Sequence, residues 1–133
     1  MILGHYEIKK RLRKDLIVRP LDVSQVRENG IDLKIDEDLV IPAKGFELAK
    51  TKETLEFPVN LVGLCNLRST YARQGLLIPP TIVDCGFKGK LVIEIANLTE
   101  EDRVLKKDAR FLHLVVCDCE GGVEYRGTYQ NQR

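Results

Sequence analysis

Hydrophobic side chains recur every four residues near the start of the chain, at Ile8, Leu12 and Leu16. Lysine and arginine fill most of the positions between them, so a narrow apolar stripe is surrounded by basic residues. This spacing predicts a short amphipathic helix within an N-terminal helical segment, residues 1–19. We interpret the basic residues as the solvated side of this helix rather than as a phosphate-binding face.

After Pro20 the helical period is replaced by short apolar or alternating runs, separated by glycine, proline, asparagine and charged residues. Strands are expected within residues 30–35, 38–41, 45–49, 61–67, 80–83, 91–96 and 110–118. No second helix of useful length is predicted. The pattern indicates a mainly β sandwich or barrel, forming one domain over residues 1–133. The polar residues 120–133 should be either a disordered tail or a lid.

Composition narrows the functional classes. The 133 residues include 21 Lys+Arg against 20 Asp+Glu, which gives a formal net charge of +1 and no general attraction to nucleic acid or anionic lipid. No apolar stretch is long enough to cross a bilayer or to act as a secretion signal, so we expect a cytoplasmic protein that binds neither nucleic acid nor membranes. The four cysteines lack the C-x-x-C spacing of zinc sites and are interpreted as structural thiols.

Arginine and hydroxyl side chains gather just after the apolar run 61–67. Arg68, Ser69, Thr70 and Arg73 could form a phosphate cradle, because a guanidinium group presents a fork of donors that matches phosphate oxygens. A solvated turn with one salt bridge would produce a similar pattern. The residues alone leave these two interpretations equally open.

Two glycines, Gly86 and Gly89, lie between the apolar runs 80–83 and 91–96 and predict a hairpin turn there. Asp84 ends the first run and could simply accept hydrogen bonds in the turn. Glu94 lies among apolar residues of the second run, where we expect it to be covered and to need a partner or a raised pKa. It is either a structural ion-pair residue or an acid/base group in a pocket.

Asp32 follows a glycine-containing turn and begins a predicted strand. An acidic residue in such a position is more often exposed or bonded within the turn than catalytic. Taken alone, it carries no functional signal.

Taken together and in this order, these stretches resemble the superfamily of trimeric dUTP pyrophosphatases (dUTPases) and dCTP deaminases. The matching motifs are Gly30-Ile-Asp-Leu33, Arg68-Ser-Thr with Ala72-Arg73, and Val83-Asp-Cys-Gly-Phe-Lys-Gly89. The spacing from Asp84 to Glu94 and the closing Tyr129-Gln-Asn-Gln132 are similar to the deaminase side, particularly its archaeal dUTPase branch. The resemblance implies a distorted β jelly roll, assembled as a homotrimer whose active sites combine residues of different subunits beneath a C-terminal lid.

The activity that this resemblance implies is hydrolysis of dUTP to dUMP and diphosphate, with Mg²⁺ held mainly by the substrate triphosphate. Asp84 would deprotonate the attacking water, and Asp32 would lie near the metal or support the phosphate loop. The implied phosphate-binding residues are Arg68, Ser69, Thr70, Arg73 and Gln132, and the implied base- and sugar-binding residues are Thr81, Ile82, Phe87, Val92, Ile93 and Tyr125.

Two alternatives remain. In the related deaminases the residue matching Glu94 activates water at C4 of cytosine, so the chain could be a dCTP deaminase or a bifunctional enzyme. Against this, Thr81-Ile82-Val83 replaces the His-Arg-Ile that monofunctional deaminases usually carry. Two further departures, His113 in place of a glutamine and Thr128 in place of a tail lysine, keep open a non-catalytic nucleotide-binding relative. We interpret His113 as structural.

Overall fold

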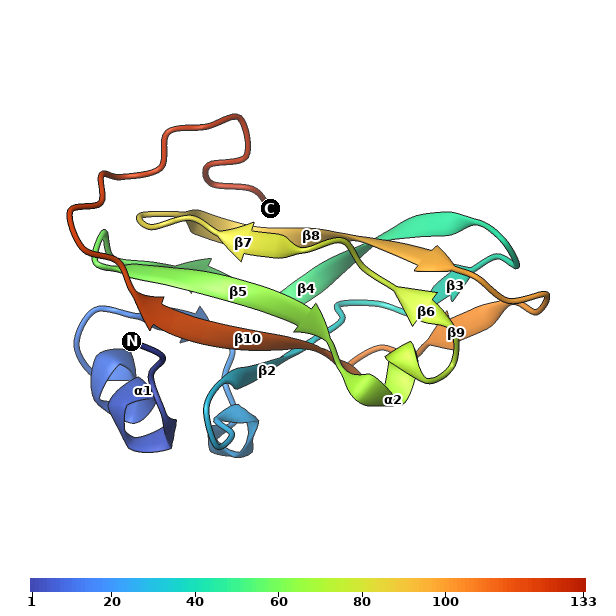
Figure 1. The fold of residues 1–133 in the computed structure, drawn as a ribbon, viewed down its shortest axis with the longest axis horizontal. Helices are drawn as coiled ribbons and strands as arrows, with labels where there is room; N and C mark the ends of the chain where they lie inside the picture. The colour runs from blue at the N-terminus through green and yellow to red at the C-terminus, as the bar shows by residue number, and fades with distance from the viewer.

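The computed structural model describes residues 1–133 as a β sandwich with short helices (Figure 1). One sheet has the strand order β1-β4-β8-β6, the other β2-β10-β5-β7, and β3 pairs with β9 in a separate ribbon. Every strand pair is antiparallel. In chain order the elements are α1 (His5–Leu12), β1 (Ile17–Arg19), the 3-10 helix η1 (Val23–Gln25), β2 (Ile31–Lys34), β3 (Leu39–Ile41), β4 (Phe46–Glu56), β5 (Leu61–Leu67), α2 (Ser69–Ala72), β6 (Leu76–Leu77), β7 (Thr81–Val83), β8 (Lys88–Asn97), β9 (Arg103–Leu105) and β10 (Arg110–Asp118). The predicted mainly β fold with a short N-terminal helix is confirmed.

Alternation of buried and exposed side chains explains where the core lies. Ile93 and Ile95 of β8 point into the sandwich, as do Leu112 and Leu114 of β10, and all four side chains are fully buried. The core cluster of 25 hydrophobic residues therefore draws on both sheets. Removing this apolar surface from water is the main favourable contribution to folding.

Strand β4 extends beyond the expected run 45–49. Its second half was not predicted because the side chains that it buries are polar. Thr51 and Glu53 are both fully buried, so the hydrophobic alternation in the sequence fades although the ladder with β8 continues to Glu56. The runs 61–67 and 110–118 match β5 and β10 from end to end.

The N-terminal segment is helical only in part. Helix α1 ends at Leu12, and Leu16 is fully buried outside it, just before β1. The helix ends in a turn where the carbonyl of Arg11 accepts the amides of Lys14, Asp15 and Leu16, and the Arg11 side chain pairs with Asp15 at 2.8 Å. The sequence analysis also missed α2, a single turn whose four residues are too few to show a helical period.

The expected hairpin at residues 84–89 is wrong, because its two strands belong to different sheets. β7 pairs with β5, whereas β8 pairs with β4 and β6. The turn crosses from one sheet to the other with Gly86 at φ +76° and Gly89 at φ +137°, a backbone conformation that favours glycine. No hydrogen-bonded ladder joins β7 to β8, so the space between these two strands is not closed by strand pairing.

A few polar side chains are buried, and every one has a partner. Glu53 accepts hydrogen bonds from Gln25 Nε2 at 2.8 Å and from the backbone amide of Lys34 at 3.0 Å. Burial disfavours the charged carboxylate and raises the pKa of Glu53, although these hydrogen bonds oppose that effect. Neither α-helix is long and apolar enough to cross a membrane.

The raised pKa of Glu53 predicts a pH dependence of stability. Folded protein holds this proton to a higher pH than the unfolded chain, whose glutamate titrates near 4.5. The free energy of unfolding should therefore fall as the pH rises from that value through the raised pKa. In urea titrations between about pH 4 and pH 8, Glu53→Gln should lose this slope and the exposed control Glu37→Gln should keep it. Parallel curves for wild type and Glu53→Gln would contradict the assignment.

Candidate active site

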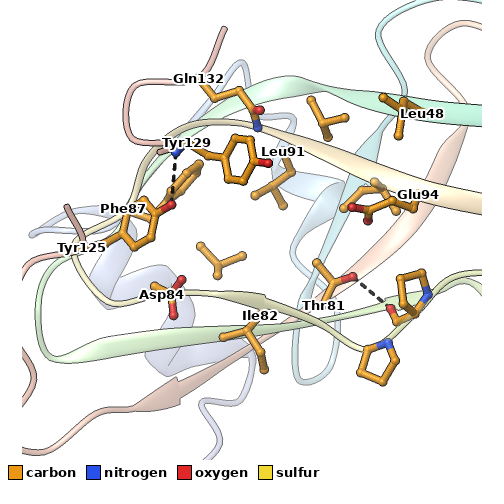
Figure 2. Close-up of a pocket in the computed structure, with 15 residues that line it drawn as sticks. Leu48, Thr81, Ile82, Asp84, Phe87, Leu91, Glu94, Tyr125, Tyr129 and Gln132 are labelled. Atoms are coloured by element: carbon orange, nitrogen blue, oxygen red, sulfur yellow. Dashed lines mark hydrogen bonds between the residues drawn. The ribbon is translucent and has the colours of Figure 1, made fainter. Parts of the chain in front are cut away.

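A pocket of about 600 Å³ opens between β7 and β8, beneath the C-terminal tail (Figure 2). This volume is in the range of small-ligand sites. The pocket is lined by Leu48, Pro79, Pro80, Thr81, Ile82, Val83, Asp84, Phe87, Leu91, Val92, Ile93, Glu94, Tyr125, Tyr129 and Gln132. It contains Asp84 and Glu94, two of the three carboxylates that the sequence singled out, and all the residues expected to bind the base and sugar.

Asp84 and Glu94 lie at opposite ends of this pocket (Figure 2). Asp84 directly follows β7, and Glu94 projects from the face of β8 opposite to its buried residues. Both side chains are exposed and neither takes part in an ion pair. The expectation that Glu94 is covered is therefore wrong, because the opposite face of β8 borders the pocket rather than the core. Two free carboxylates are available for acid/base work.

Aromatic rings form one wall of the pocket. Phe87 is 6% exposed and its ring centroid lies 5.8 Å from that of Tyr125, with the rings tilted by 58°. The hydroxyl oxygen of Tyr125 accepts a hydrogen bond from the backbone amide of Tyr129 at 3.2 Å, which fixes the second ring. An aromatic wall of this kind suits a sugar or a heterocyclic base.

The C-terminal tail is ordered along the turn and the start of β8. The amide of Lys90 donates to the carbonyl of Gln132 at 2.7 Å, and Gln132 Nε2 returns a bond to the carbonyl of Lys90 at 2.9 Å. The amide of Asn131 donates to the carbonyl of Lys88 at 2.7 Å. Of the two expectations for the tail, disorder is wrong; opening and closing as a lid stays a prediction. Thr128 is exposed and does not line the pocket.

The expected phosphate-binding stretch lies at the other end of the molecule. Val83 pairs with Gly63 on β5, so Asp84 lies near Val62, whereas Arg68 follows the far end of that strand. At 3.3 Å per residue the two ends are about 20 Å apart. Figure 1 shows α2 and the turn before β8 at opposite ends of β5. Within one chain, Arg68, Ser69, Thr70 and Arg73 are not part of the pocket, but Gln132 is.

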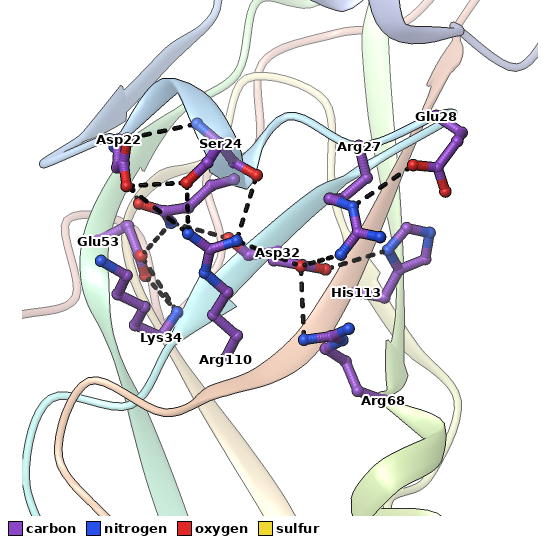
Figure 3. A network of polar contacts seen from close by, with 11 residues as sticks. Asp22, Ser24, Arg27, Glu28, Asp32, Lys34, Glu53, Arg68, Arg110 and His113 are labelled. Carbon is purple, nitrogen blue, oxygen red and sulfur yellow. Dashed lines mark hydrogen bonds and ion pairs between the residues drawn. The ribbon is translucent and has the colours of Figure 1, made fainter.

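Asp32 anchors a cluster of basic side chains beside this stretch (Figure 3). Its carboxylate is 1% exposed and has basic atoms of Arg27 at 3.2 Å, Arg68 at 3.5 Å and Arg110 at 3.9 Å. His113 Nδ1 lies 3.7 Å away. The sequence had suggested that Asp32 is exposed or bonded within the turn, and this is wrong because its carboxylate is buried among basic groups. Asp32 pairs with Arg68, one of the expected phosphate-binding residues. Its other two arginine partners, Arg27 and Arg110, were not identified from the sequence.

No group of three or more acidic, histidine or cysteine side chains is arranged to hold a metal ion. The basic groups around Asp32 are unlike the oxygen-rich surroundings that Mg²⁺ requires. The residues of one chain therefore do not form a protein-only Mg²⁺ site, and an indirect metal role for Asp32 stays a prediction.

Sequence reasoning also missed several residues that line the pocket. Leu48 reaches it from β4, a contact that depends on strand pairing, and Leu91 lines it from β8. Tyr129 belongs to the closing motif that was noticed in the sequence, so its position there was the available signal.

Comparisons with known proteins agree with these features. A family model described as dCTP deaminase-like matches residues 34–119. A dCTP deaminase of Pyrobaculum islandicum is 41% identical over an alignment 164 positions long, which covers the whole chain and 93% of that protein. A probable deoxyuridine 5'-triphosphate nucleotidohydrolase of Sulfolobus islandicus rod-shaped virus 1 is 40% identical over 151 residues, covering the whole chain and 95% of the viral protein.

Solved structures show the same fold. The dCTP deaminase of Agrobacterium tumefaciens superimposes with a TM-score of 0.73 at 17% identity, over 86% of this chain and 47% of that one. The dUTPase of EIAV superimposes with a TM-score of 0.65 at 24% identity, over 84% of this chain and 95% of that one. The expected dUTPase-type fold and the family resemblance are both confirmed. The chain belongs to the dCTP deaminase/dUTPase superfamily of enzymes.

Proposed function

We propose that this enzyme acts on a pyrimidine deoxynucleoside triphosphate and deaminates dCTP to dUTP. The observation that carries the proposal is the presence of two unpaired carboxylates, Asp84 and Glu94, in one pocket with an aromatic wall. The dCTP deaminases at about 40% identity support dCTP as the substrate. The two reactions thus change places: the sequence alone had favoured dUTP hydrolysis, with dCTP deamination as the alternative.

In the proposed deamination, Glu94 is the general acid/base. Its carboxylate takes a proton from water, the resulting hydroxide attacks C4 of cytosine, and the proton passes to the departing amino group. The products are dUTP and ammonia. Because no salt bridge holds Glu94, its carboxylate is free to exchange protons with water and substrate.

Hydrolysis of dUTP to dUMP and diphosphate is the second candidate. Ile82 lies in the pocket where monofunctional deaminases usually carry an arginine, and the viral relative is named as a dUTP hydrolase. Here Asp84 would deprotonate the water that attacks the α-phosphorus. Mg²⁺ bound to the triphosphate would neutralise its charge. An enzyme with both activities would convert dCTP to dUMP.

A product assay separates the candidates. Purified protein with Mg²⁺ should release dUTP and ammonia from dCTP, whereas dUMP from dUTP would identify the second activity. Glu94→Gln should reduce deamination by about 10²- to 10⁴-fold and affect any dUTP cleavage less, and Asp84→Asn should show the reverse preference. The exposed control Glu100→Gln should leave both rates unchanged. No turnover of either nucleotide would leave only a binding function.

We further propose that a homotrimer completes the site. The pocket contains two carboxylates and no lysine or arginine, so one chain alone would repel a triphosphate. Arg73 is exposed without an ion pair, which leaves its guanidinium free for an anion of an adjoining copy. A groove that includes Phe46 and Leu77 adjoins the pocket at Pro79, Pro80 and Glu94. The exposed apolar side chains of Phe46 and Leu77 support an interface beside the pocket.

Subunit mixing tests this arrangement. Asp84→Asn and Arg73→Ala should each be inactive on dUTP. Trimers co-expressed from equal amounts of both should regain about a quarter of the wild-type dUTP hydrolysis, if the protein has that activity, because that share of sites receives both native residues. For deamination, Glu94→Gln replaces Asp84→Asn in the same design. Sedimentation should give three times the 15.1 kDa chain mass. A monomer, or a mixture no more active than its separate parents, would contradict shared sites.

A further inference from the structure

Two cysteine thiols meet where the tail begins. Cys85 follows Asp84 in the turn before β8, and Cys119 is the first residue after β10. A Cβ atom built on Gly122 would lie 2.8 Å from Cys85 Sγ and 3.0 Å from Cys119 Sγ, so the two sulfurs flank one small space. Disulfide formation requires this kind of proximity between side chains.

Backbone contacts hold both cysteines in place. The Cys85 thiol donates to the carbonyl of Val123 at 3.1 Å, and its own carbonyl accepts the amide of Tyr125 at 3.0 Å. The amide of Cys119 donates to the carbonyl of Asn60 at 2.8 Å. Both sulfurs therefore lie within 3.0 Å of one point beside Gly122, on backbone segments that are held by hydrogen bonds.

The other two cysteines are poorly suited to this chemistry. Cys65 is buried in the core, and burial raises its pKa to about 12, so it forms almost no thiolate near neutral pH. Cys117 is half-buried within β10, where its backbone pairs with Val62. The neighbouring Cys85 thiol raises the pKa of Cys119.

We propose that Cys85 and Cys119 form a reversible disulfide that fastens the start of the tail to the turn carrying Asp84. The oxidant is a small disulfide such as oxidised glutathione. The Cys85 thiolate attacks one of its sulfurs and releases one glutathione thiolate. The Cys119 thiolate then attacks the mixed disulfide at Cys85 Sγ and releases the second. Two protein thiols are oxidised, one small disulfide is reduced to two thiols, and two protons leave the cysteines.

The bond would join the two ends of a chain segment that contains β8, β9 and β10. Closing this loop restricts the unfolded chain and stabilises the folded state. It also limits the opening of a tail that supplies Tyr125, Tyr129 and Gln132 to the pocket. The effect on turnover rests on the proposed function, whereas bond formation does not.

The test uses the full-length protein with oxidised glutathione. Non-reducing peptide mapping should identify a Cys85–Cys119 link, with a mass loss of about 2 Da and no retained glutathione. The Tm should rise by about 10 °C and return to its starting value with a dithiol reductant. Cys119→Ser should lose the link and the Tm shift, and the matched control Cys117→Ser should keep both.

A second variant leaves all four cysteines intact. Gly122→Ala places a methyl group 2.8 Å from Cys85 Sγ, 3.0 Å from Cys119 Sγ and 2.7 Å from the carbonyl oxygen of Val59. The displacement that this crowding forces on the two thiols should slow formation of the link by at least about 10-fold. Glutathione that stays attached to Cys85, a link that involves Cys117, or no link at all would overturn the proposal. If the link forms in a protein that turns over neither dCTP nor dUTP, the proposed function fails while the disulfide stands. If the enzyme is active, the oxidised form should have a kcat several-fold lower, restored by reduction.

Discussion

The pocket depends on the close approach of two backbone segments. A Cβ atom on Gly89 would lie 2.6 Å from both the amide nitrogen and the carbonyl oxygen of Gln132, and one on Gly86 would lie 2.7 Å from the Cα atom of Glu124. Any larger residue at either position would push the tail away. The same two glycines, with positive φ, let the chain cross from one sheet to the other. The turn between β7 and β8 therefore both separates the two strands around the pocket and packs against the C-terminal tail that covers the pocket.

Charge is divided between two distant regions of the chain. The pocket carries Asp84 and Glu94 without a cation, whereas near α2 the single buried carboxylate of Asp32 faces three guanidinium groups. Asp32 holds Arg68, while Glu28 pairs with Arg27 and Asp22 pairs with Arg110, so the charges of this cluster balance. The cation left without a partner at this end is the exposed Arg73, which suits an anion. The pocket offers an aromatic wall for a base, whereas the triphosphate needs cations that the pocket does not contain. This complementarity is the physical basis for proposing that copies of the chain share their sites.

Sequence patterns predicted the local features well, and they failed where the answer depended on distant partners. Strands β5 and β10 could be delimited because each is a mostly apolar run bounded by polar residues. The residues expected to bind the base, together with Asp84 and Glu94, do line one pocket, and the resemblance had identified their motif. The same pattern could not tell that β7 and β8 join different sheets, since a glycine-flanked turn is compatible with either outcome. For that reason the exposure of Glu94 was missed. The burial of Asp32 was missed similarly, because two of its arginine partners come from β10 and from the start of α2.

A crystal structure of the Glu94→Gln variant with dCTP would test the central claim most directly. We expect the cytosine ring between β7 and β8 with its C4 edge toward position 94, the deoxyribose against Phe87, and the phosphates on Arg68 and Arg73 of an adjoining copy. The same chain offers other cations, Lys88, Lys90 and Arg133, in a separate polar cleft that shares only Gln132 with the pocket. Phosphates bound in that cleft, or a base bound outside the pocket, would contradict the account.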